Sequence, residues 1–203
     1  TEIYTLSLHD ALPIYISEKV EGSNWYGGVG ADGNFVVGQR SGAIIPDDPS
    51  AHTWWATAIN QGILDTAMLI RNEKFPGKSV IFRGELAGGS IQSNIYKFPK
   101  FQIFVYDLLV DGKYVDALDF LGLTAAYEVQ AVPMLGISRT LREWMTFHKY
   151  TDIINASHGK SLLGDNLREG IVIKPVREVA WKGLPENRLM IKQRDPIDRK
   201  SVV

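Results

Sequence analysis

Residues 15–40 of the chain read YISEKVEGSNWYGGVGADGNFVVGQR, and this stretch decides the fold class. Apolar and polar residues alternate in it and are interrupted by glycine, which is the pattern of short strands joined by tight turns. We therefore predict three strands, within YISEKV, NWYGGV and NFVVGQR. The glycine cluster at 27–34 contains no lysine–threonine pair, so we interpret it as a hairpin turn and not as a phosphate-binding loop.

Helix and strand signals alternate along the rest of the chain. Apolar residues at helical spacing predict a helix over 51–70, with Ser50 as its N-cap. The very apolar segment 101–110 predicts a strand that is buried on both faces. Because strands outnumber helices and come in hairpins, we expect an α+β domain of mainly antiparallel sheets with flanking helices. The other expected strands are 79–86, 170–175 and 187–193, and the other expected helices are 117–127 and 139–150.

The composition is that of an ordinary globular protein. The 203 residues are enough for one sizeable core, so one domain is the working expectation. A formal net charge of −1 gives no general attraction for nucleic acid, and any such contact needs a local basic patch. The absence of cysteine excludes disulfides and a cysteine nucleophile. With no apolar run long enough to span a bilayer, we expect a cytoplasmic protein.

Five short segments carry the chemistry when they are taken together. They are EKVEGSN at 18–24, GQRSG at 38–42, RGELAGGSIQSN at 83–94, FVYDLLV at 104–110 and REGIVIKPV at 168–176, with NRLMIK close behind. In this order they resemble the motifs of the covalent nucleotidyltransferase superfamily of ligases and capping enzymes. The resemblance is specifically to ATP-dependent RNA ligases of the bacterial and phage type that repairs nicks. It implies an α+β nucleotidyltransferase fold, an ATP-grasp-like ligase adenylation domain.

The resemblance makes Lys19 the residue that becomes joined to AMP. An ammonium has no lone pair, so Lys19 must lose its proton before it attacks the α-phosphorus of ATP, and nearby positive charge or desolvation favours that loss. Lys174, Lys182 and Lys192 are the candidates for the positive charge. The last motif of the family aligns with either Lys182 or Lys192, and both stay candidates. Taken alone, K-x-x-G is a weak signal, and an exposed strand lysine is the alternative for Lys19.

The resemblance also assigns residues to the nucleotide. Gly22 follows where the backbone approaches the nucleotide closely, Glu18 lies against the adenine, and Asn24 helps to position the phosphate or the metal. Glu85 binds the ribose hydroxyls, with local pairing or capping as its alternative. Glu21 stands where many relatives have aspartate, a departure that bears on the ribose contact.

Four further residues receive roles by the same resemblance. Tyr106 stacks on the adenine, for which a flat ring is suited, with simple core packing as its alternative. Arg40 holds the 5'-phosphate of RNA or the phosphates of ATP, and its alternative is a solvent-exposed arginine at a hairpin end. Glu169 is associated with the divalent metal, unless it pairs locally, and Lys174 neutralises the α-phosphate in the transition state.

The expected reaction has three steps: Lys19 attacks ATP to give lysyl-AMP and pyrophosphate, AMP passes to a 5'-phosphate end, and a 3'-hydroxyl displaces AMP to seal the strand. ATP and Mg²⁺ or Mn²⁺ are the expected cofactors. The expected partner is RNA with 5'-phosphate and 3'-hydroxyl ends in a nicked duplex, with no membrane or protein partner. The rivals are a DNA ligase, a capping-type nucleotidyltransferase and a catalytically silent RNA-binding relative. Intact Lys19, Glu85, Glu169 and Lys174 argue against a silent relative.

The two ends of the chain differ in character from the rest. Residues 1–14, TEIYTLSLHDALPI, and residues 198–203, DRKSVV, resemble translated sequencing-adapter sequence. We therefore expect that neither segment was selected to pack with this fold. This leaves residues 15–197 as the expected adenylation domain, in a natural protein that continues in both directions.

Overall fold

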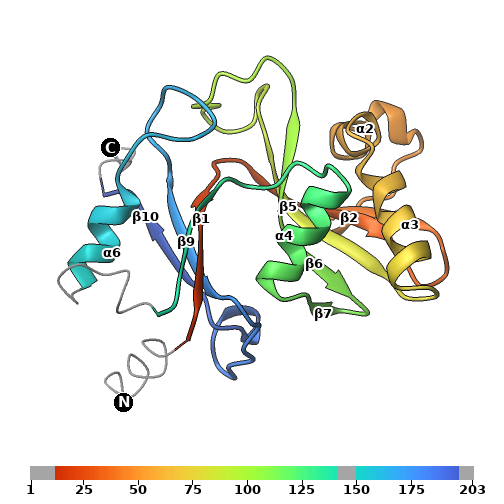
Figure 1. The fold of residues 1–203 in the computed structure, drawn as a ribbon. Coiled ribbons are helices and arrows are strands. Elements are labelled where there is room, and N and C mark those ends of the chain that lie inside the picture. The colour runs from red at the N-terminus through yellow and green to blue at the C-terminus, as the bar shows by residue number, and fades with distance from the viewer. Residues whose placement is uncertain (1–11, 141–149, 197–203) are drawn as a thin grey trace. The chain divides into compact units, whose positions relative to one another are not determined.

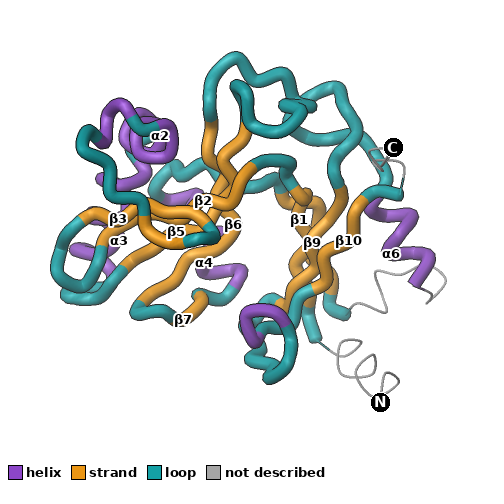
Figure 2. The backbone as a smooth tube through the Cα atoms, turned by 180° about the vertical axis from the view of Figure 1, so that it is seen from behind, coloured by secondary structure: helices purple, strands orange, loops and turns teal. Residues whose placement is uncertain are grey.

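The computed structural model describes residues 12–140 and 150–196, and this part of the chain forms two compact units, each with its own sheet (Figures 1 and 2). Unit 1 consists of residues 12–20, 116–118, 132–140 and 150–196, and unit 2 consists of residues 21–115 and 119–131. The α+β class and the mainly antiparallel sheets expected from the sequence are confirmed. Within the described residues, no helix is long and apolar enough to cross a membrane.

Unit 1 is built on a four-stranded antiparallel sheet in the order β10-β9-β1-β8. Its strands are β1 (Ile14–Lys19), β8 (Met134–Ser138), β9 (Gly170–Pro175) and β10 (Ile191–Arg194). One face of this sheet packs with α6 (Tyr150–Ser157) around a core made almost wholly of isoleucine. The core includes Ile14, Ile16, Ile153, Ile171 and Ile173.

Ile14 is the last residue of the segment that we expected to lie outside the fold. It forms the first residue of β1 and is buried in the isoleucine core. The neighbouring carbonyl of Pro13 accepts a hydrogen bond of 2.8 Å from the Val176 amide. The described residues of that segment therefore pack within unit 1.

Unit 2 is built on a six-stranded antiparallel sheet in the order β4-β3-β2-β5-β6-β7. The glycine cluster forms the predicted hairpin turn, closed by a hydrogen bond of 2.8 Å from the Gly30 amide to the Asn34 carbonyl. The first half of β6 is buried on both faces, as its apolar sequence predicted. The strands are β2 (Ser23–Val29), β3 (Phe35–Gln39), β4 (Gly42–Ala43), β5 (Val80–Ala87), β6 (Gln102–Val110) and β7 (Lys113–Tyr114).

Helices cover one face of the unit 2 sheet, and a single apolar core joins them to the strands. Trp25, Phe82 and Leu108 enter this core from β2, β5 and β6, and Ile70 and Phe120 enter it from the helices. Asn24 and Glu85, which neighbour core residues along their strands, are thereby directed to the opposite face. The helices are η1 (Pro49–Ala51), α2 (Thr53–Asn60), α3 (Ile63–Lys74) and α4 (Ala117–Ala126).

The single helix predicted over 51–70 is wrong, because α2 and α3 are separated at Gly62. Gly62 has φ 68° and ψ 13°, a left-handed conformation that ends α2. The side chain of Gln61 contacts β6, since its Oε1 accepts a hydrogen bond of 2.7 Å from the Ile103 amide. The N-cap of α2 is His52 and not Ser50, the residue predicted for the helix. The Ser50 hydroxyl donates instead to Asp48.

The other expected elements are mostly confirmed, with differences near the C-terminal end. The strand expected at 187–193 is shorter and later, because the buried Arg188 binds Glu178 and holds residues 177–189 in an irregular hairpin. β8 and α6 were not predicted. The helix expected at 139–150 falls mainly on residues 141–149, which lie outside the described residues.

Candidate active site

One face of the unit 1 sheet carries two of the predicted lysines. Ile16 of β1 and Ile173 of β9 point into the isoleucine core. Because side chains alternate along a strand, Lys19 and Lys174 point to the other face. The register of the two strands pairs Lys19 with Gly170 and Tyr15 with Lys174. The two lysines predicted to act on the same phosphate therefore share one sheet face.

Lys192 and Lys182, the two candidates for the last motif, occupy different surroundings. Lys192 lies on β10 opposite Val172 of β9, which places it on the same sheet face as Lys19 and Lys174. Lys182 lies in the connection between β9 and β10, where it is exposed. The structure thus groups Lys192, and not Lys182, with the other two lysines of this face.

Glu169 joins two cations directly before β9. Its Oε2 lies 2.5 Å from Lys19 Nζ and its Oε1 lies 3.2 Å from Arg194 Nε. The Glu169 side chain is 9% exposed and that of Lys19 is 22% exposed, so their ion pair is largely shielded from solvent. Arg194 was missed by the sequence analysis. Its position two residues after Lys192 would have identified it, since residues two apart on a strand share a face.

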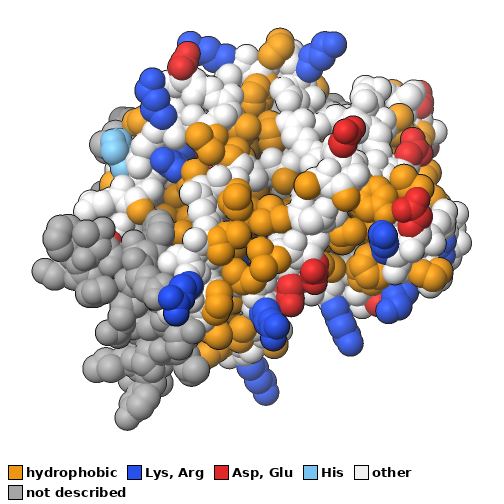
Figure 3. All heavy atoms as spheres, in the orientation of Figure 1, with side chains coloured by type: hydrophobic (Ala, Val, Ile, Leu, Met, Phe, Trp, Pro, Cys, Tyr) orange, Lys and Arg blue, Asp and Glu red, His pale blue; other side chains and the backbone are white. Residues whose placement is uncertain are grey.

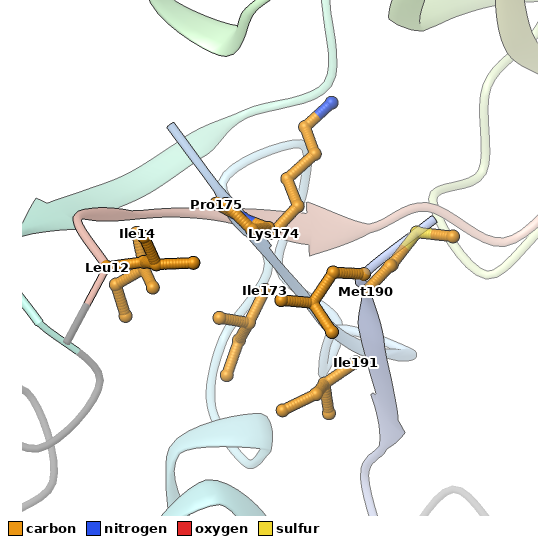
Figure 4. Close-up of a pocket in the computed structure, with 8 residues that line it drawn as sticks. Leu12, Ile14, Ile173, Lys174, Pro175, Met190 and Ile191 are labelled. Carbon is orange, nitrogen blue, oxygen red and sulfur yellow. The ribbon is translucent and has the colours of Figure 1, made fainter. Parts of the chain in front are cut away.

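Lys174 is only 5% exposed, and such burial is uncommon for a lysine. Its ammonium lies 5.4 Å from the centroid of the Tyr15 ring, in a cation–π contact. Figure 4 shows the Lys174 side chain leading away from a small apolar hollow lined by Ile14, Ile173 and Ile191, among others. The charge of Lys174 is therefore presented on the face opposite the isoleucine core.

Glu18 faces away from Lys19 and holds a loop. It is only 1% exposed, and its Oε1 accepts a hydrogen bond of 2.5 Å from the Ser161 hydroxyl. Its Oε2 accepts one of 2.9 Å from the Leu162 amide. Both carboxylate oxygens are thus engaged by the segment that leads towards Glu169. The arrangement of this carboxylate gives no support to an adenine contact by Glu18.

The face of the unit 2 sheet opposite the helices brings together three of the predicted residues. Asn24 and Glu85 are directly opposite each other on β2 and β5. The Asn24 side-chain amide donates a hydrogen bond of 2.9 Å to the hydroxyl of Tyr106, which is half-buried. Tyr106 is therefore directed to this face and not into the apolar core. Tyr26 shares the face, and burial raises the pKa of its phenol, which stays neutral.

Gly22 and Glu21 are fixed by packing within unit 2. A Cβ atom on Gly22 would lie 2.5 Å from the Leu86 carbonyl oxygen and 2.7 Å from Cγ of Glu85, so only glycine fits beside β5. Glu21 is 4% exposed, and its Oε1 accepts a hydrogen bond of 3.0 Å from the Ser93 amide. Arg40 lies one residue beyond β3 and is exposed, which agrees with the alternative of a solvent-exposed arginine at a hairpin end and leaves its predicted phosphate contact untested.

The charges on the unit 1 face fit a polyphosphate. Lys19, Lys174, Lys192 and Arg194 supply four cationic side chains, and Glu169 supplies a carboxylate that could also bind a hard divalent cation through oxygen. Among the described residues, no group of three or more His, Cys, Asp and Glu side chains is placed to hold a metal ion.

Comparison with solved structures shows the same fold in an RNA ligase of Naegleria gruberi. Two mutants of the Naegleria gruberi RNA ligase, both solved with ATP and Mn, match with TM-scores of 0.77 and 0.78 at 17% sequence identity. A further mutant, solved with AMP and Mn, matches with a TM-score of 0.76 at 17% identity. These matches cover 94–96% of this chain and 52–53% of the matched chains.

The chain therefore spans about half the length of these structural relatives. A comparison with curated proteins gives no match. The sequence model of the RNA ligase family matches residues 12–193, which include all five motif segments and both sheets except Arg194, the last residue of β10. The chain belongs to the RNA ligase family.

Proposed function

We propose that this chain carries the adenylate-transferring site of an ATP-dependent RNA ligase. The neutral amine of Lys19 attacks the α-phosphorus of ATP, a phosphorus–nitrogen bond forms, and the bond to the leaving pyrophosphate breaks. AMP then passes to the 5'-phosphate of an RNA end, and a 3'-hydroxyl displaces it. The observation that carries this proposal is the face of unit 1 on which Lys19, Lys174 and Lys192 lie beside Glu169 and Arg194.

The lysines have separate roles in this proposal. Lys174 is buried and tied to the Tyr15 ring, so its ammonium is already positioned to stabilise the charge that develops on the α-phosphate. Lys192 and Arg194, nearer the exposed edge of the sheet, bind the outer phosphates or the pyrophosphate. Lys182 is the weaker candidate because it lies outside this face.

Glu169 controls the state of Lys19. In the structure, Lys19 Nζ lies 2.5 Å from Glu169 Oε2 and forms an ion pair with it. Attack requires the neutral amine, so Glu169 must release Lys19 before the phosphorus–nitrogen bond forms. Glu169, together with phosphate oxygens of ATP, would hold Mg²⁺ or Mn²⁺, which would offset phosphate charge when bound.

In unit 2, the sheet face opposite the helices is proposed to bind the nucleoside. Tyr106 offers a ring for stacking on the adenine, and Glu85 offers a carboxylate for the ribose hydroxyls. Asn24 holds the Tyr106 hydroxyl and so orients the ring. Arg40 is proposed to bind the 5'-phosphate of the RNA, for which an exposed guanidinium is suited.

The test is incubation of the purified chain with α-labelled ATP and Mg²⁺, followed by denaturing electrophoresis. We expect a labelled protein band that Lys19→Ala abolishes and that Lys78→Ala, a change of an exposed lysine in unit 2, leaves intact. Labelled GTP in place of ATP tests a capping-type activity. No band from folded protein with any nucleotide would contradict the proposal and favour a silent RNA-binding relative.

The acceptor needs a separate experiment. Nicked duplexes with a 5'-phosphate at the nick, in all-RNA and all-DNA versions, are offered to the preformed lysyl-AMP protein. We expect transfer of AMP to the RNA end. Preferred transfer to the DNA end would identify a DNA ligase and leave the lysyl-AMP chemistry unchanged.

A further inference from the structure

The segment 88–100 of unit 2 forms a compact loop between β5 and β6. It is the yellow-green loop at the top of Figure 1. The two ends of the loop meet, because a Cβ atom on Gly88 would lie 2.4 Å from the carbonyl oxygen of Lys100. The side chain of Asn94 closes the loop internally. Its Nδ2 donates to the Phe98 carbonyl at 3.0 Å, and its Oδ1 accepts from the Phe98 backbone amide at 3.0 Å. Such self-contained loops are frequently functional.

This loop is fastened to the segment that follows Lys19. The Ser93 amide donates to Glu21 Oε1 at 3.0 Å, the Glu21 amide donates to the Tyr96 hydroxyl at 3.0 Å, and the Gln92 side chain donates to the Gly22 carbonyl. Gly22 follows Lys19 by three residues, so their Cα atoms lie within about 11 Å of each other whatever the conformation of the chain. The loop is therefore hydrogen-bonded to the chain segment that directly follows the proposed nucleophile.

The charge of the loop is wholly positive. Residues 86–106 contain two lysines, Lys97 and Lys100, and no aspartate or glutamate, in a chain whose net charge is −1. Both lysines are exposed, as are Ser90, Gln92 and Ser93. On the face of the molecule shown in Figure 3, lysine and arginine side chains are dispersed among hydrophobic and other side chains. Ammonium, hydroxyl and amide groups are the groups that bind the phosphates and sugars of nucleic acids.

The backbone of the loop is strained where these side chains lie. Gln92, Asn94 and Lys97 have φ angles of 47°, 44° and 55°, in the left-handed region that non-glycine residues rarely adopt. Such conformations persist only where the surroundings enforce them, and they concentrate at functional sites. The strain here is maintained by the contacts with Glu21 and Gly22 and by the internal bonds of Asn94.

We infer that the loop 88–100 is a contact surface for the phosphate backbone of the RNA strand that is to be joined, with Lys97 and Lys100 as its principal contacts. This inference rests on the proposed function, because it assigns the loop to the RNA substrate of the same site. The loop binds RNA after lysyl-AMP has formed and takes no part in the reaction with ATP. RNA contact thus comes from a local basic loop in a chain without net positive charge.

The experiment compares Lys97→Glu/Lys100→Glu with a matched control, Lys78→Glu/Lys113→Glu, which makes the same charge change at exposed lysines of unit 2 outside the loop. Binding of a nicked RNA duplex is measured at several salt concentrations for each protein in its lysyl-AMP form. Each lost phosphate contact lowers the slope of log affinity against log salt by about one, so the loop variant is expected to lose about two and the control much less.

Formation of lysyl-AMP from labelled ATP, measured on the same proteins, separates the two proposals. Because this step needs no RNA, the loop variant is expected to retain it, which also shows that the variant is folded. Unchanged RNA affinity and salt slope in a variant that forms lysyl-AMP would overturn the role of the loop while the ligase proposal stands. Equal losses in the loop and control variants would also overturn it. Absence of lysyl-AMP in the unsubstituted protein would instead defeat the proposed function.

Discussion

Glu169 holds two cations at once, with Lys19 at one carboxylate oxygen and Arg194 at the other. The pair with Lys19 is largely shielded from solvent, whereas the Arg194 side chain is 75% exposed. At this scale the chemistry depends on single charges, and the variants that test it change one charge while keeping the shape of the side chain.

For Glu169→Gln we expect a loss of lysyl-AMP formation on the order of 100-fold, the size associated with removal of one well-placed electrostatic group. The amide keeps the shape of the side chain but carries no charge for Lys19, Arg194 or a divalent cation. Initial rates with labelled ATP at several Mg²⁺ concentrations provide the measurement. Asp165→Asn, at an exposed loop position of unit 1, is the control and should react at the normal rate.

Lys192→Ala and Lys182→Ala decide which lysine serves the last motif. We expect Lys192→Ala to slow lysyl-AMP formation by about 10- to 100-fold, as expected for loss of one charge-assisted hydrogen bond. Lys182→Ala should change the rate little, because Lys182 lies in the connection outside the cationic face. A larger effect at Lys182 than at Lys192 would contradict the assignment.

At the scale of elements, strand β1, which carries Lys19, is held in place partly by Glu18. The Glu18 side chain points to the sheet face opposite Lys19 and binds Ser161 and Leu162 there. Ser161→Ala removes the donor to Glu18 Oε1 and leaves part of a buried carboxylate without its partner. We expect the free energy of unfolding to fall by roughly 1–3 kcal/mol. Denaturant unfolding measures the loss, and Ser161→Thr, which keeps the hydroxyl, should recover most of it.

Gly22→Ala tests the packing between the K-x-x-G segment and β5. The added methyl group would meet the Leu86 carbonyl and Cγ of Glu85, and the backbone oxygen cannot rotate away. We expect a loss of about 1–3 kcal/mol, typical of overpacking, together with slower lysyl-AMP formation.

Gly122→Ala is the matched control for Gly22→Ala. Gly122 lies in α4, where an added Cβ meets nothing within 4 Å. This substitution should raise stability by roughly 0.5–1 kcal/mol, because alanine is the better helix former. Thermal unfolding of both variants gives the comparison, and equal stabilities would contradict the packing argument.

At the scale of the whole molecule, the chain passes between the two units several times, and only one unit comes from a nearly continuous segment. Residues 21–131 contain all of unit 2 and only three residues of unit 1, residues 116–118. Unit 1 needs β1, which lies between β8 and β9 in its sheet although it precedes them by more than a hundred residues.

We therefore expect a fragment of residues 21–131 to fold with its six-stranded sheet, and a fragment of residues 132–203 to remain unfolded for want of β1. Circular dichroism and the dispersion of amide NMR signals distinguish the two outcomes. Addition of a peptide with the sequence of residues 12–20 should induce structure in the second fragment if the missing strand is the reason. Independent folding of residues 132–203 would show that β1 is dispensable.

The sequence by itself determined most strands of the two sheets, although not β4, β7 or β8, together with the hairpin that joins β2 and β3 and most of the charged residues. It could do so because alternation, glycine turns and motif order are local properties of the chain. It also placed Lys19 at the end of a strand, and the structure agrees. The helix over 51–70 was predicted as continuous because its apolar spacing is continuous, whereas Gly62 and the contact of Gln61 with β6 divide it.

Only the tertiary structure decided which charged groups meet. Glu18 binds Ser161 across 143 positions of the chain, and Glu169 pairs with both Lys19 and Arg194. Lys192 joins the cationic face because β10 pairs with β9 in one particular register, whereas Lys182 lies in the connection between these two strands. Strand order and register arise from non-local packing and hydrogen bonding, and no pattern within a single segment contains them.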